Sequence, residues 1–130
     1  MKNKEIIIKA VNIKDFISSL PKEGKFGEKI FFNNNESILG FKIITSKEPS
    51  KSESHDNFTD VFLVQEGSEE FFIGGEIVNK ELKAVGEWIG SDISGARKYI
   101  IEAGDVVIIP KGIPHMHGNG VIKSVVIKIK

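Results

Sequence analysis

Short apolar runs separated by turn residues fill most of this chain and limit the folds open to it. The runs lie at residues 29–32, 37–45, 60–65, 71–73, 99–101, 106–109 and 121–129. Glycine and asparagine between them are typical of turns that connect strands. Many short strands with almost no helix predict an all-β sandwich or barrel.

Helical spacing occurs once, near the N-terminus. Apolar residues recur every three or four positions over residues 11–20, and Pro21 supplies a stop signal. We therefore expect one short helix. A polar stretch at residues 46–57 is then expected to be a loop that delivers His55 to the next strand.

Three details of the strand pattern can be stated as expectations. Gly67, between the runs at 60–65 and 71–73, predicts a hairpin. Residues 76–98 are less regular and predict a strand with a long excursion. The C-terminal lysines indicate the wet face of an edge strand protected by charge, and they are Lys123, Lys128 and Lys130.

Composition narrows the class of function. The chain has 130 residues, which fits one domain, and its 18 basic and 18 acidic side chains cancel. A neutral chain lacks the charge expected of a nucleic-acid binder or a polybasic membrane-surface protein. There is no cysteine, so thiolate metal sites, disulfides and a cysteine nucleophile are excluded. Any metal must be held by nitrogen and oxygen.

No apolar stretch has the length of a signal peptide core or a membrane span. We therefore expect a cytoplasmic protein that binds neither a membrane nor a nucleic acid.

The most informative stretch is residues 104–119, GDVVIIPKGIPHMHGN. Gly104 predicts a turn, the apolar run a buried strand, and Pro110 with Gly112 a bend out of it, so that His115 begins the next strand. The pattern G-x5-P-x-G-x2-H-x3-N resembles the second motif of the cupin family at every fixed position. The resemblance implies a double-stranded β-helix, also called a jelly-roll or cupin barrel, with one short N-terminal helix outside it.

Cupins carry a first motif upstream, G-x5-H-x-H, then three or four residues, then E-x6-G. Asp60 and Gly67 match the E-x6-G part with Asp in place of Glu, and a four-residue spacer puts His55 in the second histidine position. Glu53 then stands where the family has its first histidine, and Lys47 replaces the leading glycine. Both substituted ligands keep an oxygen able to bind metal.

Two imidazoles and one carboxylate from separate strands form a three-ligand pattern that suits iron, manganese, nickel or zinc and leaves positions open. His55, Asp60 and His115 would supply it, with Glu53 as a further ligand. All three histidines of the chain fall within residues 53–67 or 104–119. We expect one divalent transition metal, of unspecified identity, inside the barrel.

Each of these residues has a simpler interpretation. His115 could be a hydrogen-bonded histidine at a strand end, and His55 a solvated loop histidine. Asp60 could cap the turn before its strand, and Glu53 could be solvated. His117, two residues after His115, could be a further ligand, a catalytic proton-transfer group near the metal, or a side chain that points outward.

Other side chains near the expected pocket have structural interpretations. Core packing is the expected role of the aromatics, with a substrate-lining role as the alternative; these are Phe62, Phe72, Trp88 and Tyr99. Glu87 could be a general acid or base, but a solvated strand residue is the simpler assignment. Lys111 could meet a substrate carboxylate at the barrel mouth or simply be exposed.

The motifs predict a metal-dependent enzyme acting on a small organic acid or sugar derivative. The alternative is a non-catalytic ligand-binding or regulatory barrel with a degenerate metal site, since Glu53 and Asp60 depart from the family pattern. We expect a single domain over residues 1–130, with a leader at 1–27 and the barrel at about 28–129. Small single-domain cupins resemble one another in forming dimers, so the resemblance also implies a homodimer.

Overall fold

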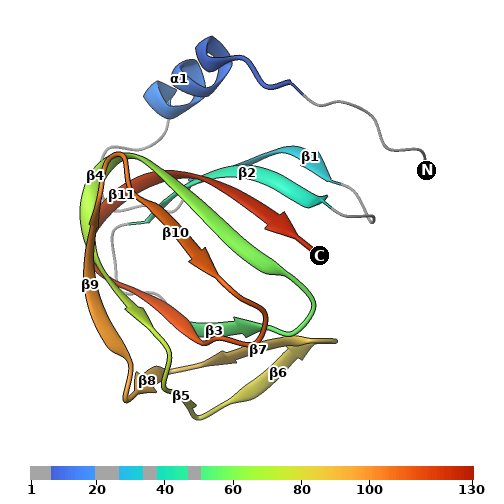
Figure 1. The fold of residues 1–130 in the computed structure, drawn as a ribbon, viewed down its shortest axis with the longest axis vertical. Coiled ribbons are helices and arrows are strands. Elements are labelled where there is room, and N and C mark those ends of the chain that lie inside the picture. The colour runs from blue at the N-terminus through green and yellow to red at the C-terminus, as the bar shows by residue number, and fades with distance from the viewer. Residues whose placement is uncertain (1–6, 20–26, 34–37, 47–50) are drawn as a thin grey trace.

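The computed structural model describes residues 7–19, 27–33, 38–46 and 51–130. It contains one helix and a series of strands (Figure 1). Their bounds are α1 Ala10–Ser19, β1 Gly27–Asn33, β2 Ile38–Ser46, β3 Ser52–His55, β4 Thr59–Ile73, β5 Glu76–Val78, β6 Glu81–Ala84, β7 Glu87–Gly90, β8 Asp92–Ser94, β9 Arg97–Glu102, β10 Val106–Ile109 and β11 His115–Ile129.

The strands build a double-stranded β-helix, as predicted. Nine of them form one antiparallel sheet, in which β1, β2, β11, β3, β7 and β6 follow one another, and β4 pairs with β11, β9 and β10. Figure 1 shows the long strands β4 and β11 bending, so that the sheet wraps around an interior. The stretch predicted as one strand with an excursion forms four short strands instead, β5 to β8, of which β5 and β8 make a separate pair.

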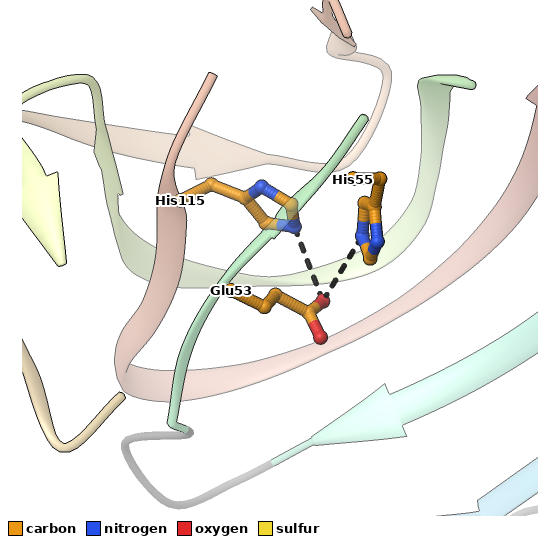
Figure 2. Close-up of side chains that lie close together, drawn as sticks. All are labelled: Glu53, His55 and His115. Atoms are coloured by element: carbon orange, nitrogen blue, oxygen red, sulfur yellow. Dashed lines mark hydrogen bonds and ion pairs between the residues drawn. The ribbon is translucent and has the colours of Figure 1, made fainter. Parts of the chain in front are cut away.

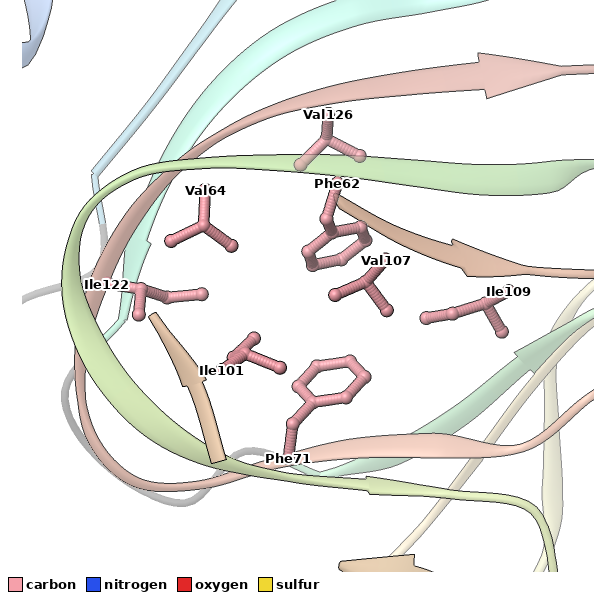
Figure 3. Close-up of a cluster of buried hydrophobic side chains, with 8 residues drawn as sticks. All are labelled: Phe62, Val64, Phe71, Ile101, Val107, Ile109, Ile122 and Val126. Atoms are coloured by element: carbon pink, nitrogen blue, oxygen red, sulfur yellow. The ribbon is translucent and has the colours of Figure 1, made fainter. Parts of the chain in front are cut away.

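The barrel interior is filled by apolar side chains from β4, β9, β10 and β11 (Figure 3). Alternate residues of a strand face the same side, which is why every second position contributes. The cluster consists of Phe62, Val64, Phe71, Ile101, Val107, Ile109, Ile122 and Val126. The predicted core position of Phe62 is confirmed, since it is buried.

Helix α1 packs on the outside of the barrel. The predicted helix covered residues 11–20, and α1 begins one residue earlier and ends one residue earlier. Leu20 and Pro21 lie outside the described residues. Ile17 is buried against Val125 of β11, with Phe16 packed beside them. No helix in the part of the chain described here is long and apolar enough to cross a bilayer.

The prediction that the C-terminal lysines mark an edge strand is wrong. β11 lies between β2 and β4 and pairs with both. Lys123 is buried and its Nζ donates a hydrogen bond to the Ile17 carbonyl oxygen at 2.9 Å, near the C-terminal end of α1. Carbonyls in the last turn of a helix lack partners within it, so a lysine that looks solvated in sequence serves as a cap here.

The predicted hairpin at Gly67 is also wrong, because β4 continues through it. Gly67 has φ of +85°, and the register slips nearby: Val64 pairs with Ser124 but Glu66 pairs with Lys123. The irregularity changes which positions face inward, from even numbers before it to odd numbers after it, so Glu69 and Phe71 are buried. Gly67 therefore marks a β-bulge within β4 and not the turn of a hairpin.

Gly67→Ala is expected to lower the free energy of unfolding by about 2 kcal/mol or more, because an added Cβ would lie 2.0 Å from the Val121 carbonyl oxygen at a positive φ. Urea unfolding measures the change. Gly104→Ala is the matched control: its φ is also positive, at +96°, but among the described residues no atom beyond its own chain neighbours lies within 4 Å of the added Cβ, so its loss of stability should be clearly smaller. Equal losses in the two variants would contradict the assigned role of the close contact.

Candidate metal centre

Two side chains of the short strand β3 enter the barrel together. Ser52 and Ser54 are buried on the opposite side of the strand, where the Ser52 hydroxyl donates to the Asp92 carbonyl oxygen at 2.7 Å. Strand alternation therefore directs Glu53 and His55 inward, as predicted for an extended segment. Residue 53 lies directly opposite His115 in the pairing of β3 with β11.

The three inward side chains converge on one small region (Figure 2). The Glu53 Oε1 atom lies 3.1 Å from His115 Nε2 and 3.6 Å from His55 Nε2. One ligand-type atom from each residue lies within 4.8 Å of the other two. Atoms bound about 2.1 Å from a common metal lie roughly 3–4 Å apart, so these spacings suit a shared ion.

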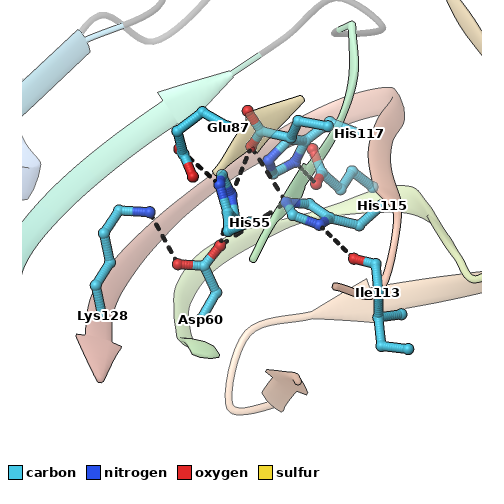
Figure 4. Close-up of polar contacts among 9 residues, drawn as sticks. His55, Asp60, Glu87, Ile113, His115, His117 and Lys128 are labelled. Carbon is cyan, nitrogen blue, oxygen red and sulfur yellow. Dashed lines mark hydrogen bonds and ion pairs between the residues drawn. The ribbon is translucent and has the colours of Figure 1, made fainter. Parts of the chain in front are cut away.

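Asp60 borders the same region from β4. Its Oδ2 lies 3.2 Å from His55 Nε2 and 3.8 Å from His115 Nε2, whereas its Oδ1 accepts a hydrogen bond from Lys128 Nζ at 2.9 Å (Figure 4). It is not one of the three residues whose ligand atoms are all mutually close. Asp60 therefore presents one oxygen to the imidazoles and the other to a lysine.

The outer nitrogens of both imidazoles face hydrogen-bond acceptors. His55 Nδ1 lies 2.8 Å from Glu87 Oε1, and His115 Nδ1 lies 3.4 Å from the Ile113 carbonyl oxygen (Figure 4). A proton on each Nδ1 leaves the Nε2 lone pair directed inward, which is the arrangement of a metal-binding histidine and its outer partner. His55 Nε2 is buried and makes no well-aligned hydrogen bond to any described atom.

In that tautomer the lone pairs face carboxylate oxygens, and a cation between them removes the repulsion. The group of donors therefore fits a divalent ion. The Glu53 side chain is 39% exposed, while the side chains of His115 and Asp60 are almost fully buried. This gives two fixed nitrogens, one fixed carboxylate and one accessible carboxylate.

The carboxylates and imidazoles of this group shift one another's pKa values in the directions expected of neighbouring opposite charges. Burial lowers the pKa of His55, but the carboxylates of Asp60 and Glu53 outweigh burial and raise it to about 9. Burial raises the pKa of Glu53, yet the two imidazoles outweigh it and hold that pKa well below its usual range. The pKa of Asp60 is lowered in the same way, by His55 and Lys128 against its burial. In the absence of a metal, a proton on His55 takes the place of the cation.

No family model and no curated protein matches the sequence. Solved structures do match. A cupin-2 domain-containing protein from Shewanella frigidimarina has a TM-score of 0.60 and 18% identity over 93% of this chain and 95% of that chain. The fold is that of a cupin. A predicted oxalate decarboxylase from Thermotoga maritima has a TM-score of 0.58 and 14% identity over 82% of each chain. The polyketide cyclase RemF from Streptomyces resistomycificus has a TM-score of 0.55 and 12% identity over 80% of this chain and 64% of that chain.

The cupin resemblance inferred from the motifs is thus confirmed at the level of the fold, and the two motif segments meet in it. The second motif leaves β10 at Pro110, and the Gly112 amide donates to the His55 carbonyl oxygen at 2.7 Å. His115 then begins β11, as predicted. The backbone contact between the segments holds His55 and His115 in position relative to each other, with ring centroids 5.3 Å apart.

His117 points into the cupin barrel rather than outward. It is buried, its ring meets Phe71 edge-on with centroids 4.9 Å apart, and its Nδ1 forms a short hydrogen bond with Glu69 Oε1. It is not among the three converging residues. Its predicted role in proton transfer stays a prediction.

Sequence reasoning missed Glu69 and Lys128 as neighbours of the site, and it favoured the solvated interpretation of Glu87 over a role as general acid or base. Glu87 of β7 contacts His55 of β3 because the two residues lie directly opposite each other in the pairing of these strands. Glu69 faces inward only because of the bulge near Gly67. Lys128 continues the inward positions of β11, so the spacing from Val126 was a signal that could have found it.

Among the remaining side chains of the predicted pocket, outcomes differ. Tyr99 was expected in the core but is 45% exposed on β9, where its strand pairs with β4 alone among the described strands. Phe72 and Trp88 are half-buried, and the Trp88 Nε1 donates to Asp56 Oδ2 at 3.0 Å. Lys111 is exposed, the simpler of its two interpretations.

Metal-free protein is expected to be most stable between about pH 4.5 and 6.5. The folded state holds the pKa values of Glu53 and Asp60 below their ordinary 4.5 and 3.8, so their contribution is lost as the solution becomes more acidic. The pKa of His55 is raised from 6.5 to about 9, so its contribution is complete below 6.5 and is lost as pH rises through 9. Urea unfolding in the presence of chelator should show the free energy of unfolding falling by up to about 3 kcal/mol between pH 6.5 and 9.

His55→Gln, which cannot take up this proton, should lose most of the slope between pH 6.5 and 9. A wild-type free energy of unfolding that is flat over that interval would contradict the assignment.

Proposed function

We propose that this cupin barrel binds one divalent transition metal through Glu53, His55 and His115, with Asp60 as a fourth donor. The observation that carries the proposal is the pair of Nε2 atoms directed at shared carboxylate oxygens while both Nδ1 atoms are held from outside. Partners of this kind are the usual outer support of metal-binding histidines.

The donor set limits the metal. Two imidazole nitrogens with carboxylate oxygens and no sulfur suit iron(II), manganese, nickel or zinc. A site of three or four protein ligands leaves coordination positions for a small molecule. We place the approach of that molecule at Glu53, whose side chain is 39% exposed.

We further propose that the protein is a metal-dependent enzyme for a small organic acid or sugar derivative. Bound metal supplies a Lewis acid there or, if it is iron, a centre that reacts with oxygen. Glu53, His55, Asp60 and His115 would orient the ligand around the ion. The Phe58 ring stacks on the His55 ring, with centroids 4.4 Å apart. Two structures with this fold are named as a predicted decarboxylase and a cyclase, so the fold by itself selects no reaction.

A non-catalytic ligand-binding barrel is the second candidate. It is favoured by the Lys128 ammonium beside Asp60, which partly compensates the carboxylate charge without any metal. The two functions differ in whether metal is bound tightly enough to co-purify.

Elemental analysis of protein purified without a histidine tag or chelator tests the proposal. We expect about one equivalent of iron, manganese, nickel or zinc per chain, and an increase in melting temperature when metal is returned to chelated protein. Metal-free native protein that gains no stability from any of the four ions would rule out the metal site and leave the binding barrel.

Glu87→Gln is expected to weaken metal binding by about 10–100-fold, because the neutral amide no longer supports the Nδ1 proton of His55. Isothermal titration with Zn²⁺ measures it. Glu81→Gln, a change at an exposed glutamate of the neighbouring strand β6, is the matched control and should bind as the wild type does. Equal affinity in both variants would show that Glu87 does not support the site.

A single domain and a homodimer, both expected from the sequence, stay predictions, as does the cytoplasmic location. Sedimentation of the full chain at micromolar concentration tests the dimer, and a monomer would contradict it.

A further inference from the structure

Lys128 stands at the rim of the barrel in a fixed position. It follows Val126 on the inward side of β11 and lies opposite Asp60 in the pairing with β4. Its Nζ donates to Asp60 Oδ1 at 2.9 Å and lies 4.3 Å from the centre of the Phe58 ring, which itself stacks on His55. An ammonium held by a buried carboxylate and an aromatic face is an ordered part of the site rather than a mobile surface charge.

We propose, resting on the metal site proposed above, that Lys128 is an internal counter-cation that competes with the metal for Asp60 and so keeps the metal exchangeable. Lys128 is a positioning residue in this scheme and binds no metal itself. It holds one oxygen of Asp60 and leaves only Oδ2 directed at the two imidazoles. The carboxylate then offers a single oxygen, already weakened as a donor by the ammonium.

Two effects of the ammonium act in the same direction. Bound metal and Lys128 are like charges on either side of one carboxylate, so each disfavours the other. Without metal, the ammonium compensates Asp60, which is almost fully buried, and so it stabilises the metal-free state. Removal of the positive charge should therefore tighten metal binding and destabilise the metal-free protein.

Zn²⁺ titration of four chelator-treated proteins tests the proposal: the wild type, Lys128→Met, Lys128→Arg and Lys128→Gln. The two neutral variants should bind Zn²⁺ at least about tenfold more tightly than the wild type. Lys128→Arg keeps the positive charge, so its Kd for Zn²⁺ should stay within a few-fold of the wild-type value. A merely structural lysine would give weaker binding in the neutral variants, never tighter binding.

A double-mutant cycle locates the effect at Asp60. Asp60→Asn should weaken Zn²⁺ binding more in the Lys128→Met background than in the wild type, because the carboxylate is a stronger donor once the ammonium is gone. Circular dichroism confirms that each protein is folded; if Lys128→Met does not fold, Lys128→Gln carries the same test.

The outcomes separate the two proposals. If the wild type binds Zn²⁺ and the neutral variants bind it equally or more weakly, the counter-cation role is overturned while the metal site stands. If neither the wild type nor the variants bind Zn²⁺ or any of the other three metals, the metal site fails and the role of Lys128 fails with it.

Discussion

His115→Ala leaves a folded protein that no longer retains a divalent metal. The side chain is fully buried, and its Nε2 is one of the two nitrogens that face Glu53. With one imidazole gone, the remaining donors bind only weakly, and we expect the metal Kd to rise by more than about a hundredfold. Elemental analysis should then find far less than one equivalent per chain.

A second histidine provides the control for that loss. His117→Gln changes a buried histidine of the same strand, two residues away, whose Nδ1 is bound to Glu69. It should retain its metal, since His117 is not one of the converging residues. A loss of metal in both variants, or in neither, would contradict the assigned ligand set.

Glu53→Ala should also raise the metal Kd by about a hundredfold or more. The Glu53 Oε1 atom lies 3.6 Å from His55 Nε2 and 3.1 Å from His115 Nε2, and Glu53 stands where the cupin motif has its first histidine. Glu53→His, which restores the family's first histidine, should keep metal binding within about tenfold of the wild type, because it returns a donor to the same position. Titration of the three proteins with Ni²⁺ and Zn²⁺ measures the difference.

If Glu53→Ala binds metal as tightly as the wild type does, Glu53 is not a metal ligand. Glu53 would then be the solvated residue of the simpler interpretation, and Asp60 would have to be the carboxylate ligand.

The fold of this protein does not by itself identify a reaction. Solved structures under 20% identical share its architecture, and two of them are named for different activities, a predicted decarboxylase and a cyclase. Function must therefore be argued from the site, which is why the predictions concern metal affinity and not a substrate.

Much of the fold could be predicted because its signals are local. The short apolar runs, the helix near residues 10–19 and the start of β11 at His115 depend on periodicity and turn chemistry within a few residues. The hairpin predicted at Gly67 failed for a local reason as well: a bulge and a turn use the same residue type, and only pairing with β11 distinguishes them.

The candidate ligands could also be predicted, because the motif spacing places Glu53, His55, Asp60 and His115 without knowledge of the fold. Their partners could not. Glu87 reaches His55 across a strand pair 32 positions apart in the chain, and Lys128 reaches Asp60 over 68 positions. No local pattern encodes which strands lie side by side.

The sequence by itself therefore determined that this is an all-β chain whose candidate metal ligands are nitrogen and oxygen atoms, because strand alternation and the absence of cysteine are properties of the residues alone. Only the tertiary structure decided the electrostatic environment and the hydrogen-bond partners of these residues. Both depend on which side chains distant strands bring within about 3 Å of the imidazoles and of Asp60, and interactions between charges fall off with distance in space, not along the chain.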